Sequence, residues 1–370
     1  MKVQQSNPTI DLEEYKAIKE CFIDQWVTEG PKSKQFEEEI KKLLGVKYGV
    51  LAPNGTLALY LGLKSIEIGR DDEVIVPDFT FIASATSVVM SEAVPIFVDV
   101  DQMNFQIDIT KCEEIVSKRK IKAIMPVHMY GQCCNMNEVL DFAKKHNLLV
   151  IEDAAQALGV SWNGKMAGSF GDVGCFSFFA DKCLTTVEGG FVATNNKKTY
   201  ERLMYLRNQG RLVRSTFVHP EIGFNFRLND IQSTIGLVQL KKFDSMIKRR
   251  QQINNLYLVL LKNVKQIDIL TCPIGSTHIP FRTILVCKDG SQDLMNYMMV
   301  NDIEPRTLFY PLHKQPCFQY LKDDQQFDDS NFPNSIYAFK NGVCLPCWPQ
   351  MTDEQVIYVA KIIKEYYNII

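Results

Sequence analysis

Short apolar runs alternate with segments of helical spacing between residues 47 and 195, and this alternation limits the fold more than any other feature. The runs predicted as strands are residues 47–51, 73–76, 94–98, 123–127 and 148–152. The segments predicted as helices are residues 56–66, 82–90 and 138–146. Near-continuous apolar strands separated by helices indicate an α/β fold with a mostly parallel sheet covered on both faces. Ligands of such sheets bind at the carboxyl ends of the strands.

The remainder of the chain predicts a second, smaller lobe. A helix near residues 198–208 precedes a polar surface loop at 210–223 and a long helix at 229–264. A turn at 273–276, a strand at 278–287 and helices at 293–300 and 352–367 then indicate an α+β unit. A chain of 370 residues is long enough for two domains. We expect a large domain over residues 1–245 and a small domain over 246–370, with the boundary inside the long helix.

Composition excludes several classes of function. The apolar and charged fractions, 46% and 23%, are ordinary for a globular protein, and the net charge of −2 favours neither nucleic acid nor a membrane as partner. No apolar export signal begins the chain, and no window approaches the about 18 apolar residues of a membrane span, so we expect a cytoplasmic protein. The eleven cysteines should then be reduced thiols. Neither they nor the five histidines show metal-ligand spacing, which predicts no metal site.

Lys182 is the first candidate catalytic residue. Most lysines are solvated surface residues, but Lys182 follows the apolar run 175–179, which is also predicted as a strand, and lies in a connection between apolar segments. Desolvation there would lower its pKa and free the amine. The chemistry of pyridoxal phosphate (PLP) needs such a lysine for the Schiff base, and an acid opposite the pyridinium nitrogen.

Asp153 and Gln156 follow the predicted strand at 148–152 and allow two interpretations. Asp-x-x-Gln is a capping box that opens a helix. Alternatively, the Asp153 carboxylate lies against the pyridine nitrogen and Gln156 faces the ring oxygen of PLP. The two interpretations do not exclude each other.

Residues that could bind the phosphate of PLP and stack on its ring are also present. Gly55 and Thr56, between a predicted strand and helix, offer backbone N–H groups and a hydroxyl to a phosphate, although most such triplets are only turns. Ser177 could add a second hydroxyl. Phe81 follows a strand, where it could stack on the pyridine or simply belong to the core.

Three further polar residues are candidates for substrate contacts. Asn225 and Arg227 are embedded among aromatic residues, and His313 follows an apolar segment. Each could equally be structural.

A series of motifs extends over nearly the whole chain in a specific order and spacing. The motifs are Trp26-Val-Thr-Glu-Gly30, Asn54-Gly-Thr56, Pro77-Asp-Phe-Thr-Phe81, Val127-His-Met-Tyr-Gly-Gln132, Glu152-Asp-Ala-Ala-Gln156, Phe176-Ser-Phe-Phe-Ala-Asp-Lys182, Glu188-Gly-Gly190, Gly223-Phe-Asn-Phe-Arg227 and Tyr310-Pro-Leu-His313. With them the chain resembles the fold-type I, PLP-dependent sugar aminotransferases of the DegT/DnrJ/EryC1/StrS group, and most of all their perosamine synthase-like members.

The resemblance implies a role for each candidate residue. Lys182 would bind PLP and act as the base, Asp153 would hold the pyridine nitrogen, Gln156 would face the ring hydroxyl and Phe81 would stack. The residues that would hold the phosphate are Gly55, Thr56, Ser177 and, from the neighbouring subunit of a homodimer, Asn225. His313, and with it Arg227, would lie near the sugar nucleotide. Val187 stands where glycine is usual in this group.

The activity that the resemblance implies is transfer of the amino group of L-glutamate to the C4 keto carbon of a nucleotide-diphospho-4-keto-6-deoxyhexose. The segment Thr185-Thr-Val-Glu-Gly-Gly190 is similar to members that aminate C4, whereas members acting at C3 more often have Asn-Leu-Gly after the lysine. A 3-keto sugar aminotransferase, a PLP-dependent sugar dehydratase and a non-catalytic regulator of the same fold are the alternatives.

Overall fold

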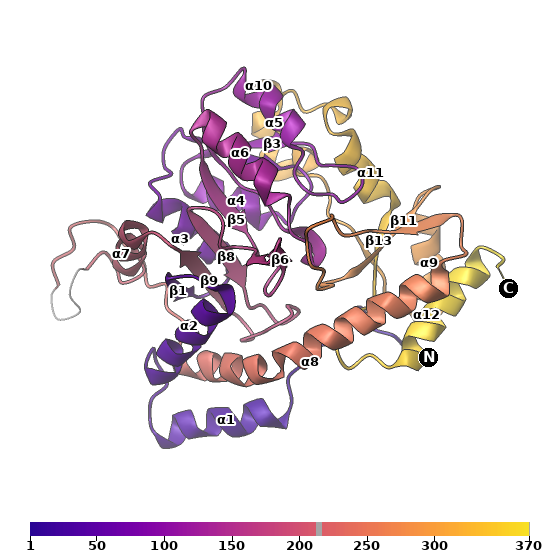
Figure 1. Ribbon diagram of the computed structural model, residues 1–370, viewed down its shortest axis with the longest axis horizontal. Helices are drawn as coiled ribbons and strands as arrows, with labels where there is room; N and C mark the ends of the chain where they lie inside the picture. Colours follow the sequence, from indigo (N-terminus) through magenta and orange to yellow (C-terminus); the bar gives the residue numbers. More distant parts are fainter. Residues whose placement is uncertain (212–216, 370) are drawn as a thin grey trace.

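The computed structural model describes residues 1–211 and 217–369. Its main sheet has seven strands in the order β1-β9-β8-β5-β4-β2-β3 (Figure 1). The strands are β1 (Tyr48–Ala52), β2 (Glu73–Pro77), β3 (Val94–Val98), β4 (Ile121–Ile124), β5 (Leu149–Asp153), β8 (Val173–Ser177) and β9 (Gly190–Thr194). β9 runs antiparallel to both of its neighbours, and the other six strands are parallel to one another. The prediction of a mostly parallel α/β sheet is confirmed.

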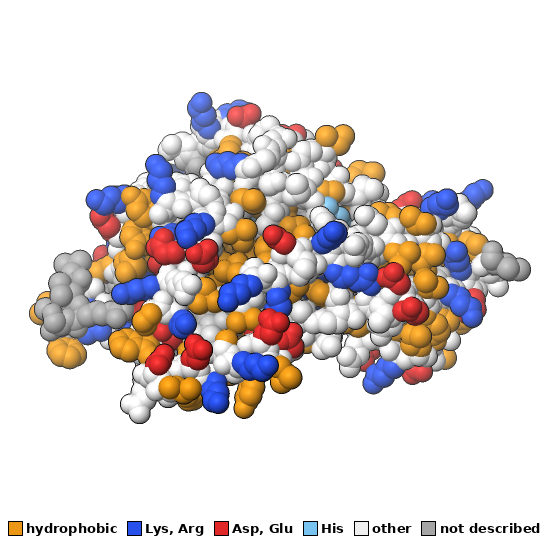
Figure 2. All heavy atoms as spheres, turned by 60° about the horizontal axis from the view of Figure 1, so that its bottom comes forward, with side chains coloured by type: hydrophobic (Ala, Val, Ile, Leu, Met, Phe, Trp, Pro, Cys, Tyr) orange, Lys and Arg blue, Asp and Glu red, His pale blue; other side chains and the backbone are white. Residues whose placement is uncertain are grey.

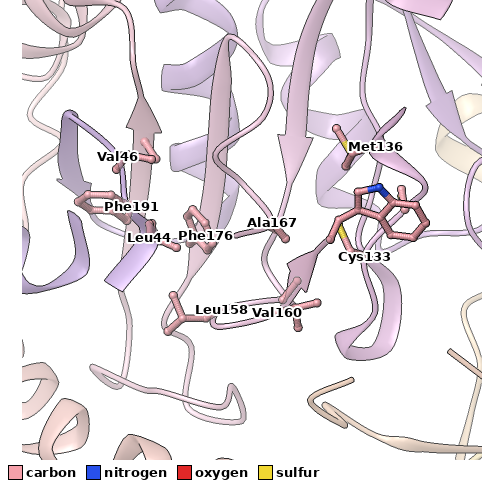
Figure 3. Close-up of a cluster of buried hydrophobic side chains, with 14 of the residues drawn as sticks. Leu44, Val46, Cys133, Met136, Leu158, Val160, Ala167, Phe176 and Phe191 are labelled. Atoms are coloured by element: carbon pink, nitrogen blue, oxygen red, sulfur yellow. The ribbon is translucent and has the colours of Figure 1, made fainter. Parts of the chain in front are cut away.

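Both faces of this sheet are buried, because successive side chains along each strand enter opposite cores. In β5, Val150 belongs to one core and Ile151 to the other. The first core also contains Phe176 and Phe191 on adjacent strands, with Leu44 close by (Figure 3). The helices that contribute to the first core are α2 (Pro31–Leu44), α5 (Ile109–Val116), α6 (Met136–His146) and the first half of α8 (Asp230–Leu261). Those that contribute to the second are α3 (Gly55–Ser65), α4 (Ala83–Met90) and α7 (Lys197–Leu206).

Helix α8, of 32 residues, connects the two parts of the chain (Figure 1). Its N-cap is Asn229, whose side chain accepts a hydrogen bond from the Gln232 N–H. Phe243 packs in the core of the large sheet, whereas Tyr257 packs in a separate core around the second sheet. α1 (Leu12–Ile23) lies against α8 on the outside of the molecule. The predicted domain boundary at residue 245 falls within α8 and stays a prediction.

The second sheet has four antiparallel strands in the order β10-β11-β13-β12. These strands are β10 (Ile267–Ile269), β11 (Thr283–Cys287), β12 (Arg306–Thr307) and β13 (Gly342–Leu345). Its core contains side chains of α9 (Gln292–Val300) and α12 (Asp353–Tyr366). Smaller elements are the hairpin β6 (Ser161–Trp162) and β7 (Lys165–Met166), helices α10 (Lys322–Gln325) and α11 (Pro333–Asn341), and 3₁₀ turns at Met129–Gly131, Leu312–Lys314, Pro316–Leu321 and Asp329–Asn331. Both chain ends lie beside this lobe (Figure 1).

Several predicted elements differ from those observed. Asp153 does not open a helix, because the residues that follow it form turns; the helix-capping interpretation is therefore wrong. The strand predicted at 278–287 begins only at Thr283, after Pro280, which has no N–H for a sheet ladder. Helices α1 and α2 and strand β9 were not predicted. The predicted loop at 210–223 includes residues 212–216, which lie outside the described residues.

The surface shows no block of a single charge on the face drawn in Figure 2, where basic and acidic side chains alternate. Within the described part of the chain, no helix is both long and apolar enough to cross a membrane. The same residues contain no group of three or more His, Cys, Asp or Glu side chains that could hold a metal ion. The cysteines are free thiols.

Candidate active site

The candidate residues gather at one edge of the main sheet. β1, β2, β5 and β8 are parallel, so their carboxyl ends meet at the same edge. Gly55, Phe81 and Asp153 follow or end three of these strands, and Lys182 comes five residues after the end of the fourth, β8. The fold therefore brings together residues that are far apart in the sequence.

Asp153 is buried at the end of β5, with 5% of its surface exposed. Its carboxylate accepts hydrogen bonds from the Ser84 hydroxyl at 2.7 Å and from the Ala155 N–H at 3.1 Å. Burial raises the pKa of Asp153, while these two bonds and the positive charge of Lys182 oppose the rise. A buried carboxylate held in this way can face a ring nitrogen and stabilise its protonated form.

Lys182 lies half-buried in the loop after β8. Its Nζ atom is 4.5 Å from the centroid of the Phe281 ring. Burial lowers the pKa of Lys182 and the charge of Arg282 lowers it further, against the opposing charges of Asp181 and Asp153. A lowered pKa favours the neutral amine, which is the form that covalent catalysis needs.

Gly55 and Ser177 form a cradle at the start of α3. A Cβ atom on Gly55 would lie 2.7 Å from the Ser177 Cβ, so only glycine allows this approach. The Asn54 side chain caps α3 through the Leu57 N–H at 2.9 Å. The N–H groups of Gly55 and Thr56 in the first turn have no intrahelical acceptor. Two free N–H groups beside two hydroxyls, those of Thr56 and Ser177, fit the phosphate of PLP.

Gln156 and Phe81 complete the set of candidate residues. The Gln156 carbonyl oxygen accepts the Tyr130 N–H at 2.8 Å, which orients the amide. Phe81 leaves 55% of its surface exposed, and its ring centroid is 6.0 Å from that of Phe309. An aromatic ring exposed at the carboxyl edge of a sheet is available for stacking.

The residues predicted to contact a neighbouring subunit or the substrate, Asn225, Arg227 and His313, form no hydrogen bond with the candidate cofactor residues in the described chain. The Arg227 Nε donates to Asn225 Oδ1 at 2.8 Å, and Asn225 pairs with Asn208; neither bonds with Gly55 or Ser177 in the described chain. His313 is buried, and its ring nitrogens lie 2.8 Å from Asp78 Oδ2 and 3.2 Å from Asp329 Oδ1. Their substrate contacts stay predictions.

Sequence reasoning missed several residues that support the site. Ser84 bonds directly to Asp153, and Arg282 forms an ion pair of 2.6 Å with Asp181, the neighbour of Lys182. Behind Asp153, the buried Glu152 accepts the N–H groups of Gly168, Phe170 and Gly171 and faces the His128 ring. Among these supporting partners, only His128 and Glu152 could have been found from the sequence, because both lie within the motifs that carry the family resemblance.

Known proteins are similar to this chain over its full length. The sequence profile of the DegT/DnrJ/EryC1/StrS aminotransferase family matches residues 8–364. The chain is 35% identical over 364 residues to the GDP-perosamine synthase of Escherichia coli O157:H7, covering 98% of this chain and 97% of that protein. It is 34% identical over 371 residues to the GDP-perosamine synthase of Vibrio cholerae, covering 98% of each chain.

Solved structures agree in fold. Spr1654 from Streptococcus pneumoniae in its PLP-form superposes with a TM-score of 0.93 at 25% identity, covering 100% of this chain and 99% of that one. Helicobacter pylori PseC, an aminotransferase of pseudoaminic acid biosynthesis, has a TM-score of 0.92 at 26% identity and covers 100% of both chains. The protein is thus a PLP-dependent sugar aminotransferase of fold-type I, and the resemblance noted in the sequence is confirmed. The chain belongs to the DegT/DnrJ/EryC1/StrS aminotransferase family.

Proposed function

We propose that the protein transfers the amino group of L-glutamate to the C4 keto carbon of a nucleotide-diphospho-4-keto-6-deoxyhexose. The product is an amino sugar nucleotide for glycan or O-antigen biosynthesis. Support comes from the relatives named GDP-perosamine synthase, at about 35% identity, and from the segment after Lys182, which resembles C4-aminating members. The observation that carries the proposal is the amine of Lys182, with its lowered pKa, at the sheet edge that also holds the buried Asp153.

The residues of the sheet edge are assigned to PLP as follows. Gly55, Thr56 and Ser177 bind the phosphate, Asp153 keeps a proton on the ring nitrogen, Gln156 faces the ring hydroxyl, and Phe81 stacks on the ring. PLP supplies an aldehyde that condenses with amines and a protonated ring that accepts electrons. The burial of Asp153 and its bond to Ser84 support its assignment, because a fixed carboxylate binds a protonated ring without reorganising.

Lys182 moves protons in both halves of the reaction. Because its pKa is lowered, the amine can be neutral and can accept a proton from the α-carbon of glutamate. After 2-oxoglutarate leaves, the same lysine carries out the reverse proton transfer on the keto sugar. One base that serves both substrates in turn predicts ping-pong kinetics.

Residues outside this set are assigned to the partner subunit and the sugar nucleotide. We assign Asn225 to the phosphate site of a second copy, which makes the active unit a homodimer, and Arg227 to the sugar nucleotide together with His313. The exposure of Asn225 supports its assignment, because an exposed side chain can reach a neighbouring copy. A cytoplasmic location belongs to the same proposal, since free thiols suit a reducing compartment.

The test is the visible absorbance of the purified holoenzyme, recorded with L-glutamate and then with 4-keto-6-deoxyhexoses carrying GDP, dTDP or UDP. The proposal expects glutamate to bleach the absorbance of the bound cofactor and one of the sugar nucleotides to restore it, with an amine at C4 of the product. No response to glutamate would remove it as donor. Loss of water from the sugar without a new amine would indicate a dehydratase.

Amination at C3 is a second candidate. The chain is 34% identical over 338 residues to a UDP-N-acetyl-3-dehydro-α-D-glucosamine 3-aminotransferase of Acidithiobacillus ferrooxidans, covering 90% of this chain and 88% of that protein. Restoration of the absorbance by a 3-keto sugar nucleotide alone would favour this candidate over amination at C4.

A further inference from the structure

Arg282 is a buried cation next to the lysine loop. It precedes β11 of the second sheet, and its side chain is 3% exposed. Its Nη2 atom donates to Asp181 Oδ2 at 2.6 Å, and Nη1 donates to the Phe281 carbonyl at 3.1 Å. Burying an ion pair carries a desolvation penalty that often outweighs its attraction, so this pair is weak evidence for stability alone.

The carboxylate that Arg282 binds belongs to the residue directly before Lys182. Asp181 is the nearest carboxylate to Lys182 along the chain, and its charge acts to raise the pKa of the Lys182 amine. In the described chain, however, the Lys182 amine forms no ion pair with any carboxylate, and its Nζ lies 4.5 Å from the Phe281 ring centroid. The Arg282 guanidinium lies 4.2 Å from the centroid of the same ring. Two adjacent residues, Phe281 and Arg282, thus contact both members of the pair Asp181 and Lys182.

We propose that Arg282 is a positioning residue for Lys182: it binds Asp181, so that Asp181 does not pair with the lysine amine and the amine stays free to condense with a carbonyl. This inference rests on the proposed role of Lys182 as the lysine that binds PLP. Arg282 itself touches neither PLP nor substrate in this account.

The charges around Lys182 support the same arrangement. Asp181, Asp153 and the Cys183 thiol raise the pKa of Lys182, and Arg282 lowers it, in addition to the effect of burial. The charges of Arg250 and Arg306 in turn lower the pKa of Arg282, and that of the Cys344 thiol raises it. Removal of the guanidinium alone leaves the Asp181 charge unopposed next to the amine, which raises the pKa of Lys182 and draws the two side chains together.

The experiment measures how fast acetic anhydride labels Lys182 in the full-length, cofactor-depleted protein as a function of pH. Peptide mass spectrometry reads the labelling at Lys182, with the exposed lysines of the same sample as internal reference. The variants are Arg282→Gln, Asp181→Asn and the double variant, with Arg249→Gln as matched control, because Arg249 pairs with Asp353 at the surface. Circular dichroism checks that each variant is folded.

At pH values below the pKa of Lys182, the proposal expects Arg282→Gln to slow labelling of Lys182 about ten-fold. This is the effect of a rise of one unit in the pKa of Lys182. Asp181→Asn alone should accelerate labelling, since Arg282 then acts unopposed. The double variant should return close to the original rate, and Arg249→Gln should not change it. Labelling that Arg282→Gln leaves unchanged, or a double variant that stays slow, would overturn the proposal.

A fallback variant and one further measurement keep the outcome decisive. If Arg282→Gln does not fold, Asp181→Asn alone decides, and an unchanged labelling rate in it rejects the proposal. Borohydride reduction of the holoenzyme locates the cofactor independently of these rates. Cofactor found on another lysine would contradict the proposed function, whereas altered labelling of Lys182 would still support the effect of Arg282 on the amine.

Discussion

The Ser84 hydroxyl donates a hydrogen bond of 2.7 Å to Asp153 Oδ2 across 69 residues of sequence. Ser84 lies in the first turn of α4, directly after the loop that carries Phe81, and Asp153 ends β5. The bond therefore joins the loop that would stack on the cofactor to the carboxylate that would hold its ring nitrogen. The Thr80 and Ser84 hydroxyl oxygens lie 3.0 Å apart, which extends the link into that loop.

Ser84→Ala should move the acidic limb of the pH–rate profile to higher pH. Burial already raises the pKa of Asp153, and the Ser84 bond holds it down; removing the bond raises the pKa further. The proposed role needs the carboxylate, so activity is present above this pKa and lost as pH falls through it. A net bond of about 1 kcal/mol predicts a shift of somewhat less than one pH unit. The dependence of kcat/KM on pH measures it.

Ser87→Ala is the matched control for this shift. Ser87 is also buried in α4, but its hydroxyl donates to the Ser84 carbonyl rather than to Asp153. Equal shifts in both variants would show that the effect comes from the helix and not from the bond to Asp153.

Gly55→Ala should weaken the binding of PLP at least about ten-fold, or about 1.4 kcal/mol. The new Cβ would lie 2.7 Å from the Ser177 Cβ, which forces the two sides of the proposed phosphate cradle apart. Equilibrium dialysis of PLP measures the dissociation constant. Gly69→Ala is the control, because the nearest atom to its new Cβ would be Lys64 Nζ at 3.9 Å. Unchanged affinity in Gly55→Ala would place the phosphate elsewhere.

His313→Gln should destabilise the protein more at pH 6 than at pH 9. Burial alone would lower the pKa of His313, but the bonds and charges of Asp78 and Asp329 raise it overall. A raised histidine pKa adds stability that is fully present below the unfolded value of about 6.5 and is lost as pH rises through the folded value. We expect a loss of about 3 kcal/mol at pH 6 in urea unfolding, and less at pH 9.

The control for His313 is His146→Gln. His146 pairs with Glu113 at the surface, and such a pair contributes less than about 1 kcal/mol. A loss in His313→Gln that is the same at both pH values would show that His313 is uncharged in the folded protein.

Val187→Gly should stabilise the protein by about 0.5 to 1 kcal/mol. Val187 has a φ of +70° with 46% of its surface exposed. A β-branched residue is strained in this conformation, and the exposed side chain gains little free energy from burial. Val187→Ala keeps most of the strain and should gain almost nothing. The midpoint of thermal unfolding of the holoenzyme separates the two variants; equal midpoints would contradict the strain.

Periodicity was enough to predict the layers of the large domain. Every predicted strand from β1 to β5 exists within a few residues, because apolar runs such as Val74, Ile75 and Val76 fit only a sheet buried on both faces. β9 escaped prediction, since its sequence directly follows the lysine loop and local pattern carries no information on strand direction. The turn after Asp153 was not predicted either. The spacing Asp-x-x-Gln occurs both in helix caps and in loops, and only tertiary contacts decide which of the two forms.

The candidate site was predictable where residues occur in motifs and not where they act through space. Lys182 and Asp153 occupy marked positions in the sequence, and the structure places both at the same edge. Ser84 lies in ordinary helix sequence and Arg282 lies directly before a strand, and only folding brings them to Asp153 and Asp181. These residues contact their partners across long sequence separations, and no local sequence pattern predicts such contacts.

Borohydride reduction of the holoenzyme, followed by peptide mapping, tests the central claim most directly, namely that Lys182 binds PLP. The account predicts the reduced cofactor on the peptide that contains Lys182, and none on the protein with Lys182→Ala, which should also lose multiple turnover. Cofactor attached to a different lysine, or turnover that survives in Lys182→Ala, would contradict it.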